Sequence, residues 1–385
     1  MTISETSIDG LTRTEELTMW AASLAPVLEA NAARHDREGT WVDESYQHLV
    51  DQGMLALAVP TQLGGMGATI RETAMVMRVL ASACASTALA MSMHQHVTAF
   101  TAWRYGRSMP GAEATLRRVA EERLVLVSTG GGDFTRPRGE AIRVEGGYRV
   151  SGHKIFASQS PVGAVMSTMF PYEDPEQGLR VLNMAVPMAD GVVVEQNWDT
   201  LGMRGTASND VRISDVFIPD ERVLANRPHG VIDAPLQVIA SIAFSIVGAV
   251  YLGVAESAAN AAIASVSGTP KAADPSCQRL VGLMHNRLRV ASWSLDGAVG
   301  AVGDDPTPSM EMFATVMAAK REIALAGIEV CDLAMDVAGG AAFFKGSPIE
   351  RAYRDIRGIK FHPLTVEQTL VHAGKLALGQ RCDEL

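Results

Sequence analysis

The sequence predicts a mainly α-helical protein with a small β-domain in the middle of the chain. Segment 124–224 has short apolar runs, alternation of apolar and polar residues with a period of two, and turn pairs such as Gly146-Gly147. These features are typical of β-strands. Long stretches rich in Ala and Leu lie on both sides of it. We therefore expect an N-terminal helical domain over 1–123, a β-barrel-like middle domain over 124–228 and a C-terminal four-helix bundle over 229–385.

The individual helices follow from apolar periodicity and from breaks at Gly and Pro. The N-terminal helices are expected at 12–34, 42–53, 70–84, 86–105 and 110–122. The bundle helices are expected at about 235–267, 275–302, 307–338 and 348–380, after a polar linker over 227–233. The glycines of Gly64-Gly65-Met66-Gly67 are expected to form a turn before a helix. Neither a preceding strand of a βαβ unit nor a Gly-Lys-Ser/Thr sequence supports a phosphate loop there.

Composition narrows the class of protein. The chain has 385 residues, of which 47% are hydrophobic and 20% charged, and its net charge is -10. A nucleic-acid partner requires a basic surface, so this charge argues against one. The four cysteines have no CxxC or CxxH spacing, so we expect neither disulfides nor a metal site. The N-terminus is polar and acidic and has no apolar core of a signal peptide, which predicts a cytoplasmic protein.

Segment 235–255 is almost uncharged and about as long as a membrane span. However, Gln237, Ser241 and Ser245 interrupt it, and it has neither a flanking Lys/Arg cluster nor an aromatic belt. We therefore expect a buried bundle helix there and no membrane partner.

Two histidines lie close together on the predicted helix 86–105. His94 and His96 are two positions apart, which places their side chains about 200° apart around the helix axis. They cannot bind one common target, so they do not form a metal-binding pair. The simplest interpretation is one core histidine and one surface histidine.

Several motifs resemble those of one family, the acyl-CoA dehydrogenase superfamily of flavoproteins, over nearly the full length. The segments that carry the resemblance are Val59-Pro60 with Gly64–Gly67, Gly131-Gly132-Asp133, Gly152–Ser158, Leu201–Thr206 leading to Pro219, and Ile349–Asp355. The resemblance implies an acyl-CoA dehydrogenase-like fold. It also implies that the isoalloxazine ring lies between the β-domain and the bundle, and that the subunits form a homotetramer.

The resemblance also implies a set of flavin contacts. The cofactor-binding residues it assigns are Ser128, Thr129, Phe156, Ala157, Ser158, Gly339, Gly340 and Thr365. Ser128 and Thr129 would face the pyrimidine edge, and Phe156 stands where the family usually has Trp against the ring. Ser158 would lie near flavin N5, where a hydroxyl can donate or accept a hydrogen bond as the redox state changes.

One departure from the family concerns the catalytic base. A dehydrogenase must remove the α-proton of a thioester, and the family uses a Glu for this step. The two positions that carry this Glu correspond here to Pro363 and Ala243, neither of which is a carboxylate. Glu256 and Glu367 are the nearest carboxylates in sequence. Glu367 is better explained by the chemistry of a helix start near Thr365.

The residue beside the vacant position is His362, and this resembles the flavin-dependent (group D) monooxygenase branch of the superfamily. The residues that match this branch are Pro348–Asp355 followed by His362, Ser158, and either His94 or His96. The branch takes reduced flavin from a separate reductase and acts through a C4a-hydroperoxyflavin formed with O2. Ser158 is expected to stabilise it, and His362 with one of His94 and His96 to act as acid–base groups.

A second departure concerns flavin retention. The family carries an Arg-x-x-Phe-Gly element whose Arg contacts the flavin pyrophosphate, and segment 265–274 has neither this Arg nor the Phe-Gly pair. Loss of a bidentate guanidinium contact favours FMN or an exchangeable FAD. Lys271 could replace it as a point charge, which leaves FAD open.

A basic series runs along the predicted last helix, made of Arg351, Arg354, Arg357 and Lys360. It could hold a nucleotide phosphate, but a salt-bridged helix face with Glu350 and Asp355 is the better explanation.

The sequence thus favours a two-component monooxygenase that acts on a small organic substrate with O2. The alternatives are an FAD-dependent acyl-CoA dehydrogenase with an unassigned base, and an inactive flavin-fold binding subunit. An apolar substrate would suit Met91, Met93, Phe100 and Phe244, although such residues at helical spacing are usually core.

Overall fold

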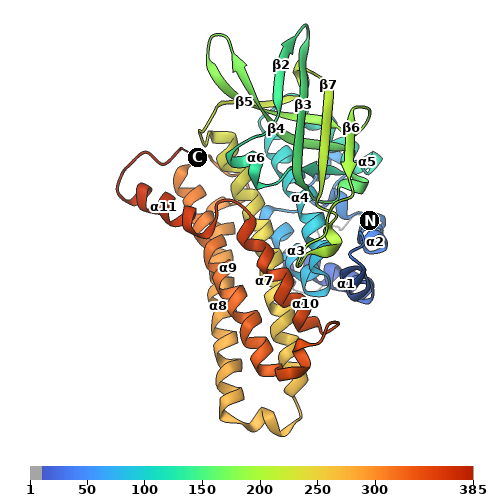
Figure 1. Ribbon diagram of the computed structural model, residues 1–385, viewed down its shortest axis with the longest axis vertical. Helices are drawn as coiled ribbons and strands as arrows, with labels where there is room; N and C mark the ends of the chain where they lie inside the picture. The colour runs from blue at the N-terminus through green and yellow to red at the C-terminus, as the bar shows by residue number, and fades with distance from the viewer. Residues whose placement is uncertain (1–10, 385) are drawn as a thin grey trace.

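The computed structural model describes residues 11–384; the polar N-terminal segment used above to predict localisation lies largely outside them. The chain forms a layer of N-terminal helices, a β-domain and a set of long helices (Figure 1). In this view the β-domain lies at the top, and α7, α8 and α9 run downward from it. The predicted fold class is confirmed.

The N-terminal part is helical, as predicted. Its elements are α1 (Arg13–Glu38), α2 (Asp43–Asp51), η1 (Met54–Ala56), η2 (Thr61–Leu63), α3 (Ile70–Ala83), α4 (Ala85–Tyr105) and α5 (Ala112–Glu122). Capping boxes at Thr12 and Thr69 start α1 and α3. Helix α1 runs past the predicted end at residue 34 and stops at Gly39, whose φ of 66° favours glycine. Gly64 follows η2 in the turn that leads to α3, as expected.

The β-domain consists of two four-stranded sheets, ordered β1-β4-β5-β8 and β2-β3-β7-β6. The strands are β1 (Leu126–Ser128), β2 (Glu140–Val144), β3 (Gly147–Ala157), β4 (Val165–Asp174), β5 (Gly178–Pro187), β6 (Val192–Glu195), β7 (Asn209–Pro219) and β8 (Val223–Pro228). Strand β1 pairs with β4 in parallel, and the other pairs are antiparallel. Buried residues such as Phe170, Leu182 and Ile218 form the domain's own core. A short helix, α6 (Gly131–Thr135), interrupts this segment, so the all-β prediction is wrong there.

The C-terminal part contains three long helices and two short ones. They are α7 (Ala234–Val266), α8 (Pro275–Val302), α9 (Met310–Ala338), α10 (Pro348–Asp355) and α11 (Val366–Ala377), with η6 (Pro270–Ala273), η7 (Gly339–Phe343) and η8 (Ile356–Phe361). The prediction of one helix over 348–380 is wrong. The chain leaves helical geometry at His362, because a residue before proline is driven to extended backbone. Thr365 then caps α11.

Helix α7 lies at the centre of the molecule. It packs against α3, α4, α8, α9, α10 and η8. Its most apolar window has a mean hydropathy of 2.2, and 89% of that window is buried inside the protein. This confirms the prediction of a core helix over 235–255. Because α7 contacts both the N-terminal helices and the bundle, it fixes the space beneath the β-domain where the site lies.

Candidate active site

Two chambers that share part of their lining lie between the β-domain and the helices. The main chamber has a volume of about 320 Å³, and its wall includes Leu89, Ser158, Trp198, Met203, Ser208, Tyr251, Phe156, Gly358 and Phe361. The smaller chamber has a volume of about 120 Å³, and its wall includes His96, Met169, Leu236, Ala240, Ala243, Phe244 and Val247. Met93, Ser128, Thr129, Gly130, Gly131 and His362 line both. These shared residues form the boundary between the two spaces.

A chain of hydroxyl groups lies on the β-domain side of the main chamber. Ser158 Oγ is 2.7 Å from Ser208 Oγ, which is 2.7 Å from Thr206 Oγ1. Thr206 donates to the carbonyl oxygen of Met203 at 3.0 Å. A hydroxyl has one proton to donate, so Ser208 then donates to Thr206 and Ser158 to Ser208. Ser158 therefore offers a lone pair to a donor in the chamber.

Aromatic side chains form another wall. Phe156, whose φ is 58° and whose surface is 45% exposed, lies 5.9 Å from Trp198 with the rings at 82°. Ala157 is fully buried and does not line either chamber. At the shared boundary, Ser128 is the last residue of β1. The next residue, Thr129, has its Oγ1 2.5 Å from Asp133 Oδ2. Of the predicted β-domain contacts, Ala157 alone does not reach the chambers through its side chain.

His362 forms a pair with Tyr251 at the boundary. The phenol oxygen of Tyr251 lies 3.0 Å from His362 Nε2. Burial, followed by the charges of Lys320 and His96, lowers the pKa of His362 to about 3. Burial raises the pKa of Tyr251, so the phenol remains protonated and able to donate. The pair therefore holds a neutral imidazole in a fixed orientation. Sequence reasoning missed Tyr251, since it lies within an apolar stretch of α7.

The structure separates the two histidines of α4. His94 Nδ1 accepts from the amide of Leu126 at 3.0 Å, and its Nε2 lies 2.9 Å from the carbonyl oxygen of Leu55. Both nitrogens of His94 are thus occupied, and it lines neither chamber. His96 lines the smaller chamber, and burial lowers its pKa to about 4. The expectation of one surface histidine is wrong, because helices and β1 cover both faces of α4.

Carboxylates around the chambers are few and occupied. Among residues 11–384, Asp133 is the only carboxylate that lines either chamber. It accepts from Thr168 at 2.8 Å and lies 3.3 Å from Lys154 Nζ. Glu256 binds Arg78 outside the site, at 2.9 Å from its Nε. No carboxylate in the described part of the chain is therefore placed as a free base there.

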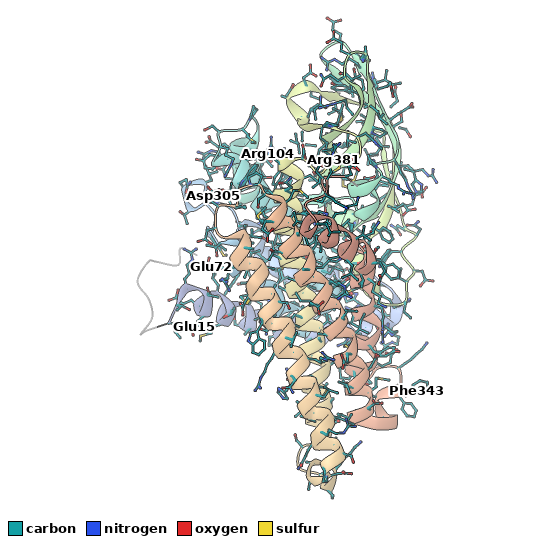
Figure 2. The ribbon with its side chains drawn as sticks, turned by 90° about the vertical axis from the view of Figure 1, so that its left-hand side faces the viewer. Glu15, Glu72, Arg104, Asp305, Phe343 and Arg381 are labelled. Atoms are coloured by element: carbon teal, nitrogen blue, oxygen red, sulfur yellow. The ribbon has the colours of Figure 1, made fainter. Side chains whose placement is uncertain are left out.

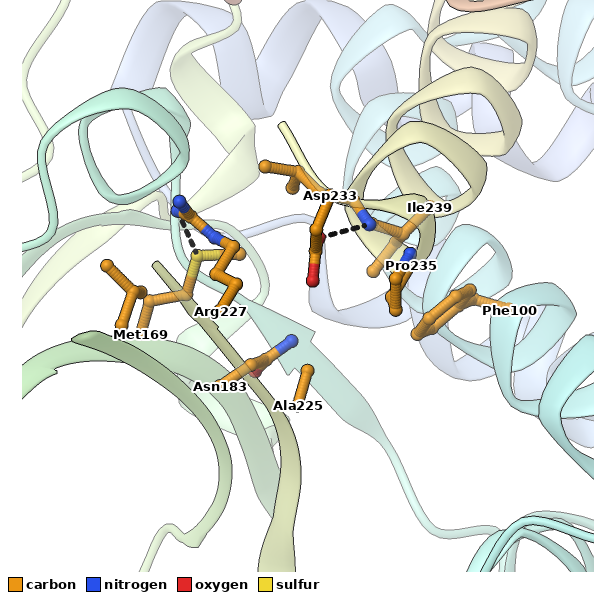
Figure 3. Close-up of a pocket in the computed structure, with 10 residues that line it drawn as sticks. Phe100, Met169, Asn183, Ala225, Arg227, Asp233, Pro235 and Ile239 are labelled. Carbon is orange, nitrogen blue, oxygen red and sulfur yellow. Dashed lines mark hydrogen bonds between the residues drawn. The ribbon is translucent and has the colours of Figure 1, made fainter. Parts of the chain in front are cut away.

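The smaller chamber ends at a hollow between the β-domain and the start of α7, shown in Figure 3. Asp233 caps α7 by accepting from the amide of Leu236 at 3.1 Å. Arg227 donates to the carbonyl of Val231 at 2.9 Å, and its guanidinium lies 3.7 Å from Met169 Sδ. These contacts occupy the polar groups at this end and leave an apolar interior. Phe100 lines the hollow, whereas Met91 belongs to the core.

The remaining predicted cofactor residues lie outside the two chambers. Thr365 lines a separate pocket of about 640 Å³ with Arg136 and Lys375, which meets the main chamber at Gly131. Gly339 and Gly340 begin η7, toward the end of the bundle away from the β-domain. Figure 2 shows Phe343, also in η7, projecting outward at that end.

Two members of the basic series, Arg354 and Arg357, form salt bridges, as predicted for this face. Arg354 lies 2.5 Å from Glu350 and 2.6 Å from Asp36, and Arg357 lies 2.5 Å from Asp332. The expected role of Asp355 in this face is wrong. Asp355 is buried and accepts from the amide of Met203 at 2.5 Å.

The main chamber fits a flat heteroaromatic ring such as isoalloxazine. Two rings, Phe156 and Trp198, supply apolar contact, and Ser158 and Ser128 supply polar contact at an edge. Glycine is required at the boundary, since a Cβ at Gly130 would lie 2.6 Å from Phe156 Cβ. A Cβ at Gly131 would lie 2.3 Å from Pro363 Cδ. The two glycines thus keep this part of the wall free of side-chain atoms.

Comparison with known proteins agrees with this geometry. Residues 14–110 match the acyl-CoA dehydrogenase N-terminal domain, and residues 245–367 match the acyl-CoA dehydrogenase C-terminal domain. The chain is 28% identical to L-evernosamine nitrososynthase of Micromonospora sp., over 93% of this chain and 89% of that protein. It is 26% identical to the putative acyl-CoA dehydrogenase YdbM of Bacillus subtilis, over 91% and 93%. A solved structure of KijD3 in complex with FMN and a dTDP-amino-keto sugar superimposes with a TM-score of 0.87 at 27% identity, covering 97% of this chain and 96% of that one.

Proposed function

Because the chain belongs to the acyl-CoA dehydrogenase superfamily, we propose that it is a flavin-dependent monooxygenase. It would use reduced flavin and O2 to transfer one oxygen atom to a small, mainly apolar substrate. The observation that carries this proposal is the boundary between the chambers: no free carboxylate of residues 11–384 lies there, and the neutral imidazole of His362 stands in its place. A dehydrogenase needs a carboxylate base at this point.

The flavin would occupy the main chamber. Phe156 and Trp198 would contact its ring, and Ser128 and Thr129 its pyrimidine edge. When bound and reduced, the flavin supplies the electrons that activate O2. Ser158 would accept a hydrogen bond at N5 through the lone pair that its bond to Ser208 leaves free.

The histidines would act on protons at the boundary. His362, held by Tyr251, can offer a hydrogen bond beside the flavin as a neutral imidazole, without carrying a fixed charge. His96 would face the substrate from the smaller chamber. A neutral imidazole avoids the repulsion that a carboxylate would exert on anionic oxygen groups. The apolar wall around Ala243, Phe244 and Val247 would exclude water from the substrate.

Several finer features extend this proposal. The KijD3 complex contains FMN, and we propose FMN or an exchangeable FAD delivered by a separate reductase. Phe343 and Phe344 are 81% and 73% exposed, which supports a homotetramer in which Gly339 and Gly340 reach the flavin of a neighbouring subunit. All four cysteines are buried and unpaired, which fits the reducing cytoplasm.

The test compares two activities of the purified protein. Photoreduced FMN or FAD is mixed with the protein and O2, and O2 consumption and H2O2 release are followed with a set of small, mainly apolar organic compounds present. Slow H2O2 release and an oxygenated product support the proposal. Anaerobic bleaching of the oxidised flavin by short-chain acyl-CoA contradicts it, and failure to bind either flavin indicates the inactive subunit.

A matched pair of variants tests the histidine. His362→Gln should accelerate H2O2 release, since the ordered hydrogen-bond donor of the imidazole is lost. His153→Gln, in which the removed ring lies 2.9 Å from Asp210 on the β-domain, is the control and should behave like the native protein.

A further inference from the structure

We propose that Lys320 is a positioning residue for His362, and that its ammonium group fixes the non-helical segment 362–364. This inference rests on the proposed role of His362 at the chamber boundary. Sequence reasoning missed Lys320, which lies on α9 and is only 3% exposed.

The contacts of Lys320 join three parts of the site. Its Nζ donates to the carbonyl oxygen of His362, and to that of Leu364 at 2.6 Å. The ring of Phe244, which lines the smaller chamber, lies 5.3 Å from Nζ. The ammonium group therefore connects α9, segment 362–364 and α7 around the boundary.

The segment needs such a donor because it lies between two helical ladders. Helical backbone ends at Phe361 in η8 and resumes at Val366 in α11. Carbonyl groups in such a break require partners from elsewhere in the structure. Lys320 supplies two donors from a rigid helix, on either side of Pro363. The main chain that carries the imidazole of His362 is thereby tied to the core of the bundle.

The cost of burying Lys320 argues against a purely incidental role. None of the ion pairs of residues 11–384 pairs it with a carboxylate. Burial of a cation without a counter-ion is unfavourable, and here it lowers the pKa of Lys320 to about 7. The unfavourable burial of this cation is explained if Lys320 serves to fix the backbone of segment 362–364, which carries His362.

Its charge acts on the ring as well. The groups that lower the pKa of His362 are, after burial, Lys320 on α9 and His96 on α4. Tyr251 on α7 contributes a neutral hydrogen bond. Removal of Lys320 should therefore both loosen the ring and raise its pKa.

The test compares Lys320→Met with a matched control, Arg104→Met. Arg104 is also a buried cation that donates to a main-chain carbonyl, that of Pro110 at 3.1 Å, but it lies outside the site (Figure 2). Proteins without flavin, labelled with ¹⁵N in the histidine rings, are titrated by NMR, and the His362 signal is assigned from its absence in His362→Gln.

In the native protein and in Arg104→Met, the His362 ring should show one neutral tautomer between pH 5 and 6, where Lys320 carries its proton. In Lys320→Met the signal should show exchange between tautomers, and its pKa should rise by about one unit or more. A His362 signal in Lys320→Met that matches Arg104→Met overturns the inference. If Lys320→Met does not fold, Lys320→Gln is compared in its place; it removes the charge, so the pKa of His362 should rise, and an unchanged pKa overturns the inference.

A kinetic comparison separates this inference from the proposed function. Lys320→Met should accelerate H2O2 release from reduced flavin and O2 at least several-fold relative to Arg104→Met. If the native protein shows no flavin reaction, the proposed function fails, while the NMR titration still decides the role of Lys320.

Discussion

The hydrogen bond between Tyr251 and His362 gives the sharpest prediction about the site. In Tyr251→Phe the ring remains and only the phenol oxygen is lost, so packing of the fully buried side chain is nearly unchanged. His362 Nε2 then has no partner at the 3.0 Å position. A buried polar atom without a partner costs about 1–3 kcal/mol. We expect a loss of this size in the free energy of unfolding.

The same loss should appear in the reaction. If the hydrogen bond from the phenol contributes about 1.4 kcal/mol to the free energy that holds the imidazole in place, the rate of H2O2 release should rise about tenfold in Tyr251→Phe. Urea denaturation followed by circular dichroism measures the first quantity. Stopped-flow mixing of reduced FMN, protein and O2, with a peroxidase-coupled dye, measures the second.

Tyr46→Phe is the matched control. Tyr46 is also buried, and its phenol donates to Gln159 Oε1 at 2.6 Å outside the two chambers. It should lose a similar free energy of unfolding and leave H2O2 release unchanged. If the two variants show the same release rate, the phenol of Tyr251 has no role in orienting His362, and the argument for the pair is refuted.

Three further predictions follow from the same geometry. Ser158→Ala should weaken FMN binding about three- to tenfold, as expected for one lost hydrogen bond, and quenching of FMN fluorescence measures this; native affinity would count against the N5 contact. Gly358→Ala should cost about 1–3 kcal/mol, because its Cβ would lie 2.6 Å from the phenol oxygen of Tyr251. Gly374→Ala, where nothing lies within 4 Å, should not destabilise α11, and urea denaturation compares the two. Burial lowers the pKa of His94 to about 4, so the unfolded chain binds its proton first, and stability should fall as pH decreases from about 6.5 to 4. A His94→Asn variant that keeps the full acid dependence would contradict this assignment.

The sequence predicted most of the architecture because the long helices carry their own signals. Segment 235–267 corresponds to α7 (Ala234–Val266), and 275–302 to α8, since apolar periodicity and Gly or Pro stops are local features. The prediction of one helix over 348–380 missed the break at His362, because it did not include the effect of Pro363 on the backbone of the residue before it. The burial of both His94 and His96 was missed. Helical periodicity gives the angle between two side chains on α4, but it does not tell how many elements pack around that helix.

The site was predicted in part for the same reason. Ser158 and His362 lie in recognisable motifs, and both line the main chamber. Tyr251 and Lys320 reach His362 across 111 and 42 residues of sequence. Within their own helices Tyr251 resembles one more core residue and Lys320 one more polar position. Only the packing of α7 and α9 around segment 362–364 reveals their connection to the imidazole.

The interruption between η8 and α11 also bears on how such a scaffold acquires new chemistry. Pro363, which occupies one of the two positions of the family's base, and His362 beside it lie outside the helices, while α7 and α9 surround them. Exchange of this short stretch alters the reactive group without loss of helical hydrogen bonds. Directed evolution of this chain should therefore find altered reactivity most readily by randomising 362–364 and keeping the long helices constant.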